Sequence, residues 1–507
     1  MSRSTENRSA VRPEPIDSLP VLPALPKQRR PQAVLLIALA LSLALSACAA
    51  LVPAPANKPA LPVPAAWSMP VAADAMAGGP TPLAQWWLRF DDPLLVALID
   101  EALRANLSVR SAEAALVQSR ALRDVQASAL APLVTGSATA QRNRTNASSA
   151  NAFQAGFDAS WEPDIFGATR AAVNAADADT IAVSATLGEV QVSVAAEVAV
   201  NYMQWRGLQE RLLIARANLD SQQETLQITQ WRAQAGLVTV LEVEQARASA
   251  EQTRALIPAL QTTAVQTEHA LAALTRNAPD GLHARLDAPA VAPVANGSLV
   301  LDIPAETLRQ RPDIRAAEAR VAAASARVTQ ADAARYASFK LDGSIGLASL
   351  TLGSLANGSS VISALLASVA GPIFDGGASA AQVRAQQAAL DQARLGYDTA
   401  VLTALRDVED SLVVLRNDRE RLVSLRAAND AAGNAALLAR QRFDSGLIDF
   451  QVVLDTQRTA LVTQQSVAAT AADLNADHVR LYKALGGGWE PSDPLADATL
   501  RTPSPRP

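Results

Sequence analysis

The longest regular hydrophobic pattern in the chain is a seven-residue repeat in its C-terminal half. No proline occurs between Pro372 and Pro491, and apolar residues recur there at spacings of three, four or seven residues. Such spacing is typical of a coiled-coil seam. It predicts a helix over residues 375–444, roughly 105 Å long at about 1.5 Å per residue. The seam positions are Val383, Leu390, Tyr397, Val401, Leu405, Val408, Leu412, Leu415 and Leu422.

Several short motifs occur twice, in the same order. Arg110–Ala114 corresponds to Arg315–Ala319 at an offset of 205 residues, whereas Glu210–Leu212 corresponds to Glu420–Leu422 at an offset of 210. Several ordered matches at two fixed offsets are not coincidence, so the sequence predicts a duplication. The change of offset means that the second copy carries five extra residues, at a place corresponding to about 120–195 in the first.

Each copy is predicted to consist of a helix, a hairpin, a very long helix, a turn and a further helix. We assign residues 84–285 to the first copy and 305–490 to the second, with a linker at 286–304. The long helix of the first copy is expected at 167–234, roughly 100 Å at about 1.5 Å per residue. Globular domains do not need helices of this length, so the duplication favours a rod or a duct.

Both long helices are predicted to end at a glycine, followed by two aliphatic residues and the N-cap of the next helix. Each copy then has a helical hairpin whose tip exposes aliphatic side chains far from any core, which suggests a docking point. The alternative is that these residues only staple the turn, and both interpretations can hold. The tips comprise Gly236, Leu237, Val238 and Thr239 in the first copy and Gly446, Leu447, Ile448 and Asp449 in the second.

Short segments between the helices alternate apolar with polar or small residues, which predicts strands at about 133–143, 152–161, 338–348 and 361–371. Strands of this length with one apolar face suit an outer-membrane β-barrel, whereas the alternative is two amphipathic hairpins on a soluble body. Four strands cannot close a barrel, and an open edge is not tolerated in lipid, so several chains would share one barrel. The predicted lipid-facing residues are Phe153, Phe157, Trp161, Leu341 and Ile345.

The N-terminus has the pattern of a bacterial lipoprotein signal. Residues 34–47 form a mostly apolar run behind basic residues, too short for a permanent membrane span. Leu45–Ala47 resembles a lipobox, so we expect a signal peptide at 1–47 and a diacylglycerol and an N-acyl chain on Cys48, which together anchor stably. The alternative is a chance cysteine at the end of a core helix. Prolines throughout 48–83 predict an extended tether.

Composition narrows the function classes. The 507 residues are 49% hydrophobic but only 4% aromatic and 18% charged, with a formal net charge of −5 and one cysteine. Few aromatic residues disfavour an ordinary enzyme core, and a lone cysteine excludes a disulfide framework. The basic residues form no dense block, so we expect no nucleic-acid partner, and we expect no metal or other cofactor. His269 and His478 are the best enzymatic candidates, but each stands alone in a helical run, so we expect no enzyme.

Six motifs together resemble the outer membrane factor family of TolC- and OprM-type ducts, over nearly the whole chain after Cys48. The lipobox makes the chain similar to the lipoprotein branch of this family, whose members serve resistance-nodulation-division efflux systems. The motifs are Trp87–Leu94, Arg311–Glu318, Phe374–Gly377, Val408–Asp410, Val453–Arg458 and Leu481–Trp489.

The resemblance implies a fold and a set of partners. The fold would be mainly α with a membrane β-barrel portion: a homotrimer with a 12-stranded β-barrel in the outer membrane and a long α-helical barrel crossing the periplasm. The linker and the C-terminal tail, 491–507, would help to build an equatorial belt. A periplasmic adaptor, or membrane fusion protein, would dock at the tips, and an inner-membrane resistance-nodulation-division pump would supply the energy.

The resemblance also implies a periplasmic gate. The matching positions are Asp455 and Arg458, and a threefold axis would turn Asp455 into a ring of three carboxylates that binds cations and narrows the path. The alternative is an ordinary surface ion pair at i and i+3. The family usually has Tyr in an Arg-Tyr-x-x-Gly run before the second tip. Here the residue is Phe443, which lacks the hydroxyl, so the gate would be weaker or differently made.

The leading hypothesis for function is a passive exit duct of a tripartite efflux system, conducting drugs or other small molecules across the periplasm and outer membrane. One alternative is a structural coiled-coil lipoprotein scaffold in the periplasm. Another is a duct that secretes a different substrate. The alternation from Phe153 to Trp161 favours a duct, because a scaffold has no need of a lipid-compatible strand.

Overall fold

The computed structural model describes residues 67, 83–144, 149–287, 293 and 308–490. All of these belong to one unit of the chain, Ala56–Pro507. The predicted signal peptide, Cys48, the tail at 491–507 and nearly all of the tether and linker lie outside the described residues.

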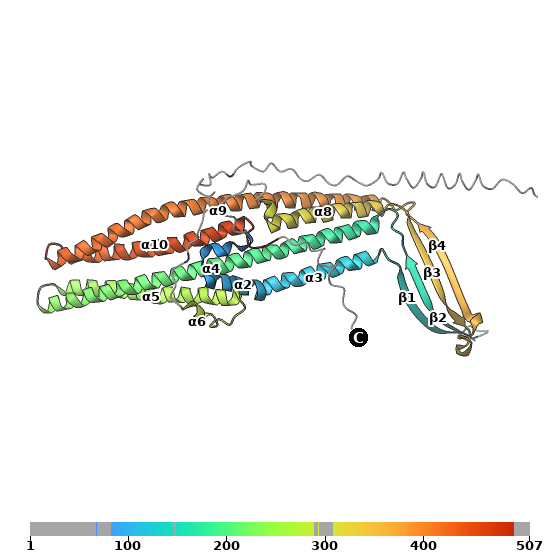
Figure 1. Cartoon of the computed structure of the whole chain (residues 1–507), viewed down its shortest axis with the longest axis horizontal. Helices are drawn as coiled ribbons and strands as arrows, with labels where there is room; N and C mark the ends of the chain where they lie inside the picture. Colours follow the sequence, from blue (N-terminus) through green and yellow to red (C-terminus); the bar gives the residue numbers. More distant parts are fainter. Residues whose placement is uncertain (1–66, 68–82, 145–148, 288–292, 294–307, 491–507) are drawn as a thin grey trace, which may run out of the picture. The chain divides into compact units, whose positions relative to one another are not determined.

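The two copies share one order of main elements, which is helix, two strands, long helix and helix (Figure 1). The first copy contains η3 (Leu83–Phe90), α2 (Pro93–Ala105), α3 (Leu107–Ser128), β1 (Leu133–Arg144), β2 (Ser149–Trp161), α4 (Ala168–Gln234), α5 (Val240–Leu274) and α6 (His283–Leu286). The second contains α8 (Pro312–Ala333), β3 (Ser338–Ser349), η4 (Leu352–Ser354), η5 (Gly358–Ser360), β4 (Val361–Ala370), α9 (Ala378–Asp444) and α10 (Phe450–Ala484). The predicted repeating unit of helix, hairpin, long helix and helix is confirmed.

The corresponding helices of the two copies are equal in length. α4 and α9 have 67 residues each, and α5 and α10 have 35 each. Along α9 the residues Val401, Val408, Leu415 and Leu422 are buried at intervals of seven, as the coiled-coil pattern predicts. α9 begins at Ala378 rather than near residue 375, because Gly377 is a left-handed N-cap with φ 88°.

The strands form one antiparallel sheet in the order β1-β2-β3-β4. The five extra residues of the second copy lie in its hairpin loop. Eight residues separate the paired Arg142 and Asn151, whereas thirteen separate the paired Leu347 and Val361. The longer loop accommodates η4 and η5.

The five predicted lipid-facing residues lie on one face of this sheet. Phe157 is directly opposite Ile345, and Trp161 is opposite Leu341. Directly opposed residues of antiparallel strands project to the same side, and Phe153 shares the parity of Phe157. On β2 and β3 the other face carries polar or small residues, including Asp158 opposite Ser344, Ser160 opposite Asp342, and a Lys340–Asp342 ion pair of 3.1 Å. The edge strands add Leu133 of β1 and Ile362 and Leu366 of β4 to this face.

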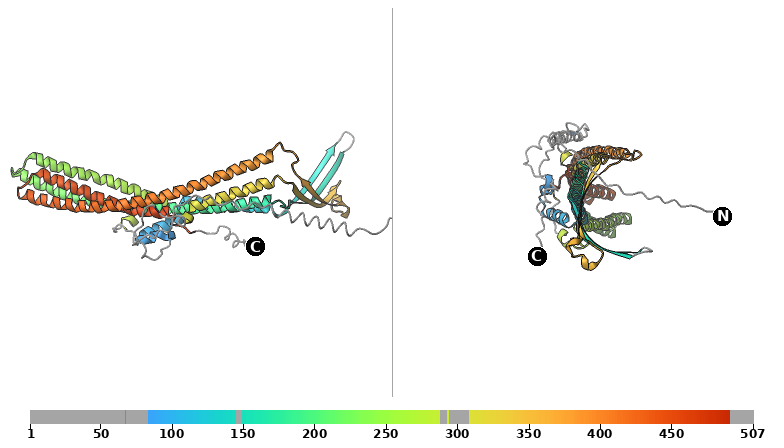
Figure 2. Two further views of the ribbon diagram at one scale, coloured as in Figure 1. Left: turned by 90° about the horizontal axis from the view of Figure 1, so that it is seen from above. Right: turned by 90° about the vertical axis from the view of Figure 1, so that its right-hand side faces the viewer.

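The helices pack side by side, with α4 against α3, α5, α8 and α10, and α9 against α8 and α10 (Figures 1 and 2). An aromatic core joins η3 to α4 and α10, where the Trp86 and Tyr482 rings stack with centroids 5.3 Å apart. Close helix contact depends on Gly207 of α4, because a Cβ there would collide with Ala472 of α10. By length and composition α4 could cross a membrane, but half of its most apolar window is buried inside the chain.

Candidate functional site

The two helical tips have the same backbone geometry. Gly236 and Gly446 adopt φ values of 73° and 72°, which only glycine adopts readily. The amide of Leu237 donates to the carbonyl of Arg232 at 2.8 Å, and that of Leu447 to Arg442 at 2.9 Å. These bonds form a Schellman cap, which places the next helix antiparallel to the long one.

The sequence predicted two roles for the aliphatic residues of the tips, docking a partner and stapling the turn. In each tip one residue suits the first role and one the second. Leu237 and Leu447 are 73% and 72% exposed, whereas Val238 and Ile448 are half-buried. Ile448 packs against a small core containing Phe450. The first aliphatic residue of each tip therefore presents an apolar surface, and the second packs back on the turn.

Beyond the turn the two tips differ. Thr239 and Asp449 are the N-caps of α5 and α10, and Glu242 accepts hydrogen bonds from the backbone amide and hydroxyl of Thr239. After the first cap, Val240 and Leu241 are 72% and 65% exposed, whereas Phe450 after the second cap is 2% exposed. The first tip therefore presents the larger apolar surface.

The predicted gate residues lie near the start of α10. Asp455 and Arg458 are both exposed, and the Asp455 carboxylate accepts a hydrogen bond from Gln451 at 3.1 Å. Within the described part of the chain, Asp455 and Arg458 form no ion pair with each other. Their carboxylate and guanidinium groups are therefore available to groups outside this chain.

Contacts between the two hairpins near their tips were not predicted from the sequence. Arg232 of α4 forms an ion pair of 3.2 Å with Asp444 of α9, and its guanidinium lies 4.8 Å from the centre of the Phe443 ring. Arg440 forms a second ion pair, 3.0 Å, with Glu224. The face of the Phe443 ring therefore makes a cation–π contact with the Arg232 guanidinium. A tyrosine at this position would add a hydroxyl group.

A polar stripe continues this contact along α4. Arg211 exchanges two hydrogen bonds of 2.8 Å with Gln465 of α10, and Asn218 donates to Gln464 at 2.7 Å. Gln457 donates to Thr225 at 3.2 Å. Positions 211, 218, 225 and 232 are seven residues apart, so one face of α4 meets the other hairpin through polar groups. The α4–α5 contact beside it is apolar, with Leu208 and Leu260 buried.

One strongly shifted titratable group lies where α9 meets α10. Burial, and then the positive charge of Arg419, lower the pKa of His478 to about 4. Its Nε2 lies 3.3 Å from Arg419 Nη2. Next to it, burial raises the pKa of Asp477, which pairs with Arg480. His478 is thus neutral at physiological pH.

The other histidines show no catalytic arrangement. His269 is exposed on α5, and His283 pairs with the buried Glu268 at 3.2 Å. Among the residues that the structure describes, no group of His, Cys, Asp and Glu side chains could hold a metal ion.

Sequence comparison gives matches over both copies. A family profile for outer membrane efflux proteins matches residues 98–275 and again residues 303–487. The toluene efflux pump outer membrane protein TtgF of Pseudomonas putida is 32% identical over 475 residues, which are 90% of this chain and 97% of that protein. The outer membrane protein OprJ of Pseudomonas aeruginosa is 30% identical over 463 residues, covering 89% and 95%.

Comparison with solved structures also finds outer-membrane channels. The outer-membrane channel OprN superposes with a TM-score of 0.78 at 34% identity, covering 86% of this chain and 99% of that one. CusC, also a transmembrane channel, gives a TM-score of 0.78 at 26% identity. The members are efflux channels rather than enzymes. With both copies matched and nine-tenths of the chain aligned to its relatives, this chain belongs to the outer membrane efflux protein family, the TolC- and OprM-type outer membrane factors.

Proposed function

We propose that three copies of this chain form the passive exit duct of a tripartite efflux system, anchored by lipid on Cys48. Twelve strands, four from each copy, would form the outer-membrane barrel. The helical hairpins would form a tube of roughly 100 Å across the periplasm, at about 1.5 Å per residue of α4 and α9.

The register of the sheet carries this proposal. It aligns Phe157 with Ile345 and Trp161 with Leu341, so that one face is apolar across neighbouring strands. A soluble scaffold would have to hide such a face, yet Phe157 and Ile345 are 63% and 59% exposed. Hydrocarbon on this side and water on the polar side satisfy both faces.

The tips and the gate complete the proposed duct. Leu237 and Leu447 would bind a periplasmic adaptor, which joins the duct to an inner-membrane resistance-nodulation-division pump. Asp455 and Arg458 would line the narrow periplasmic end. The polar face of the strands, with Asp158 and Ser344, would line a wet passage, so the pump rather than the duct would choose the cargo of drugs or other small molecules.

The proposed protein has two separable membrane anchors, the lipid on Cys48 and the strands of the barrel, and this allows a decisive test. We expect Cys48→Ser to lose incorporation of labelled palmitate but to remain in the outer membrane, because the barrel still holds it. A scaffold anchored only by lipid would instead appear in the soluble periplasmic fraction. Chemical cross-linking of the membrane fraction should give trimers for both the variant and the parent protein. Release of Cys48→Ser as a soluble monomer would contradict the proposal.

A further inference from the structure

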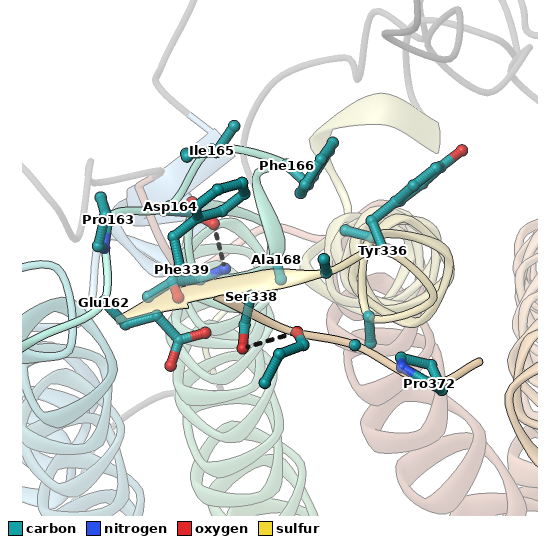
Figure 3. A pocket seen from close by; sticks show the side chains of 16 residues that line it. Glu162, Pro163, Asp164, Ile165, Phe166, Ala168, Tyr336, Ser338, Phe339 and Pro372 are labelled. Carbon is teal, nitrogen blue, oxygen red and sulfur yellow. Dashed lines mark hydrogen bonds between the residues drawn. The ribbon is translucent and has the colours of Figure 1, made fainter. Parts of the chain in front are cut away.

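Within one chain, the sheet meets the helices through an aromatic contact (Figure 3). The segment that connects β2 to α4 places the Phe166 ring on Tyr336, with centroids 4.9 Å apart and planes within 18°. Phe339 lies next to it, at 6.5 Å. Tyr336 belongs to the turn that connects α8 to β3, and Phe339 is the second residue of β3. The contact thus joins the connection after the second strand of one repeat copy to the turn before the first strand of the other.

The duplication supplies both halves of this contact a second time, and the structure leaves both uncovered. The connection between β4 and α9 contains Ile373 and Phe374, which are 103% and 92% exposed. The turn between α3 and β1 includes Leu130, which is 39% exposed, and β1 begins with Leu133 and Val134, which are 65% and 62% exposed. A fully exposed Phe beside an equally exposed Ile is unfavourable in water.

These two surfaces cannot meet within one chain. β1 and β4 are the opposite edges of the sheet, three strand spacings or roughly 14 Å apart at about 4.8 Å per spacing. Among the described residues, the outer edges of β1 and β4 have no strand partner. Unpaired backbone edges require a partner strand in a membrane.

We infer that Ile373 and Phe374 of one copy pack on the Leu130–Val134 segment of a second copy of this chain, next to a β4–β1 strand pair. This inference rests on the trimer of the proposed function and adds to it the contact residues and the register. The occupant is a second copy because the contact repeats one already made inside the chain. In that contact the β2–α4 connection takes the place of the β4–α9 connection, and the turn at Tyr336 that of the turn at Leu130. The correspondence is between segments, because the offset of 210 residues pairs Phe374 with Asp164, two residues before Phe166.

The repeat also fixes the register of the strand pair. β1 maps onto β3 at an offset of 205, and β2 onto β4 at 210, as the paired residues of the two hairpins show. The observed pair Asp158 and Ser344 then maps onto Ser368 of one copy and Thr139 of the next. Both lie on the polar face of the sheet, where cysteines would be accessible to an oxidant.

Cysteine cross-linking tests the register. We expect Thr139→Cys with Ser368→Cys to form disulfide-linked dimers and trimers under oxidation in membranes, because directly opposed residues approach within disulfide range. The matched control, Gln141→Cys with Ser368→Cys, is shifted by two residues on the same face and should cross-link at least about tenfold less. The single variants report any contribution of Cys48.

A trimer that cross-links only through the shifted pair would overturn the register and leave the duct intact. A protein that sediments as a monomer and cross-links at neither pair would contradict the proposed function as well.

Replacement of the aromatic residue tests the packing. We expect Phe374→Ser to speed subunit dissociation at least about tenfold, the change that exposure of one buried Phe gives. Helical circular dichroism of the chain should not change, since Phe374 contacts little within its own copy. The control is Leu352→Ser, a 69% exposed residue of the β3–β4 loop, which should leave dissociation unchanged. Unchanged dissociation of Phe374→Ser, with fluorescence of Phe374→Trp quenched by brominated lipid, would assign the residue to lipid and overturn the contact.

Discussion

Arg232 Nη2 lies 3.2 Å from Asp444 Oδ1, and this ion pair joins the last turn of α4 to the last residue of α9. Both residues precede a left-handed glycine, so the pair lies at the ends of the long helices, where the two hairpins meet. The Phe443 ring beside it adds a cation–π contact. A hairpin that moved outward as a unit would have to break these contacts.

We expect loss of this pair to favour the open periplasmic end. Partly exposed ion pairs contribute up to about 1 kcal/mol, which changes a two-state equilibrium about fivefold in each copy. Arg232→Ala should therefore raise single-channel open probability and sensitivity to vancomycin, a drug too large for ordinary porins. The control is Arg247→Ala, which breaks an exposed pair with Glu244 on α5 alone. Equal leakage from both variants would refute a role for the pair between hairpins.

A second prediction concerns the ring that three copies would form at Asp455. Removing the carboxylate in Asp455→Ala, together with Arg458→Ala, should raise conductance and reduce block by divalent cations, because a ring of three charges attracts them. Glu251→Ala is a suitable control, since its carboxylate pairs with Arg254 of the same helix, α5, and takes no part in the contact between hairpins. If the double variant leaks no more than the parent and keeps its cation block, these residues are surface groups.

A third prediction concerns adaptor binding. Leu237→Glu places a charge on a 73% exposed side chain that makes no core contact, so the trimer should form normally. Drug resistance in cells with the cognate pump should fall to that of a strain lacking the duct, because burying an unpaired carboxylate at an interface is costly. Leu447→Glu should weaken resistance less, since its tip has the smaller apolar surface. Leu352→Glu provides a control of similar exposure. Full resistance with Leu237→Glu would exclude this tip as the docking surface.

A fourth prediction uses two helical glycines with opposite surroundings. Gly207→Ala should lower stability, since the clash with Ala472 costs about 1–3 kcal/mol and exceeds the helix-propensity gain of about 1 kcal/mol. Gly433→Ala should raise stability by about 0.5–1 kcal/mol, because a Cβ there meets nothing within 4 Å. Thermal unfolding of the purified protein, followed by helical circular dichroism, measures both. A stabilised Gly207→Ala would disprove the close α4–α10 packing.

A fifth prediction follows from His478. Its pKa is lowered to about 4, so between that value and about 6.5 the unfolded chain binds a proton that the folded chain does not. The contribution of His478 to the free energy of unfolding is therefore fully present above about pH 6.5. It falls towards pH 4, by at most about 1.4 kcal/mol per pH unit. His478→Gln should flatten that part of the stability profile, measured by urea unfolding at several pH values, relative to His269→Gln. An unchanged profile would show that His478 is solvated.

The long-range regularities of this fold were predictable because they repeat. Seven-residue spacing predicted α9, the twin motifs predicted the duplication, and period-two alternation located the strands. Gly236 and Gly446 identified the tips because a left-handed cap has few other solutions. The start of α9 was less accurate, since the backbone turn at Gly377 and its acceptor Asp375 compete with helix propensity.

The side-chain contacts between hairpins were not predictable in the same way. Arg232 and Asp444 are 212 residues apart, and their meeting depends on how the two copies pack. Positions 211, 218 and 225 carry a polar residue at every seventh position, which indicates a polar stripe on one face of the helix but does not identify the helix that it meets. Likewise, the sequence alone could not divide the tips into outward Leu237 and inward Val238, because that depends on the angle of the turn.

The most direct test of the account is the conductance of the purified protein in planar lipid bilayers. We expect discrete, ohmic channel events from trimers, which are small in the parent protein because the periplasmic end is narrow and larger in the Asp455→Ala and Arg458→Ala double variant. No conductance from either protein, together with extraction of the delipidated chain by mild salt, would contradict a duct and leave a structural lipoprotein.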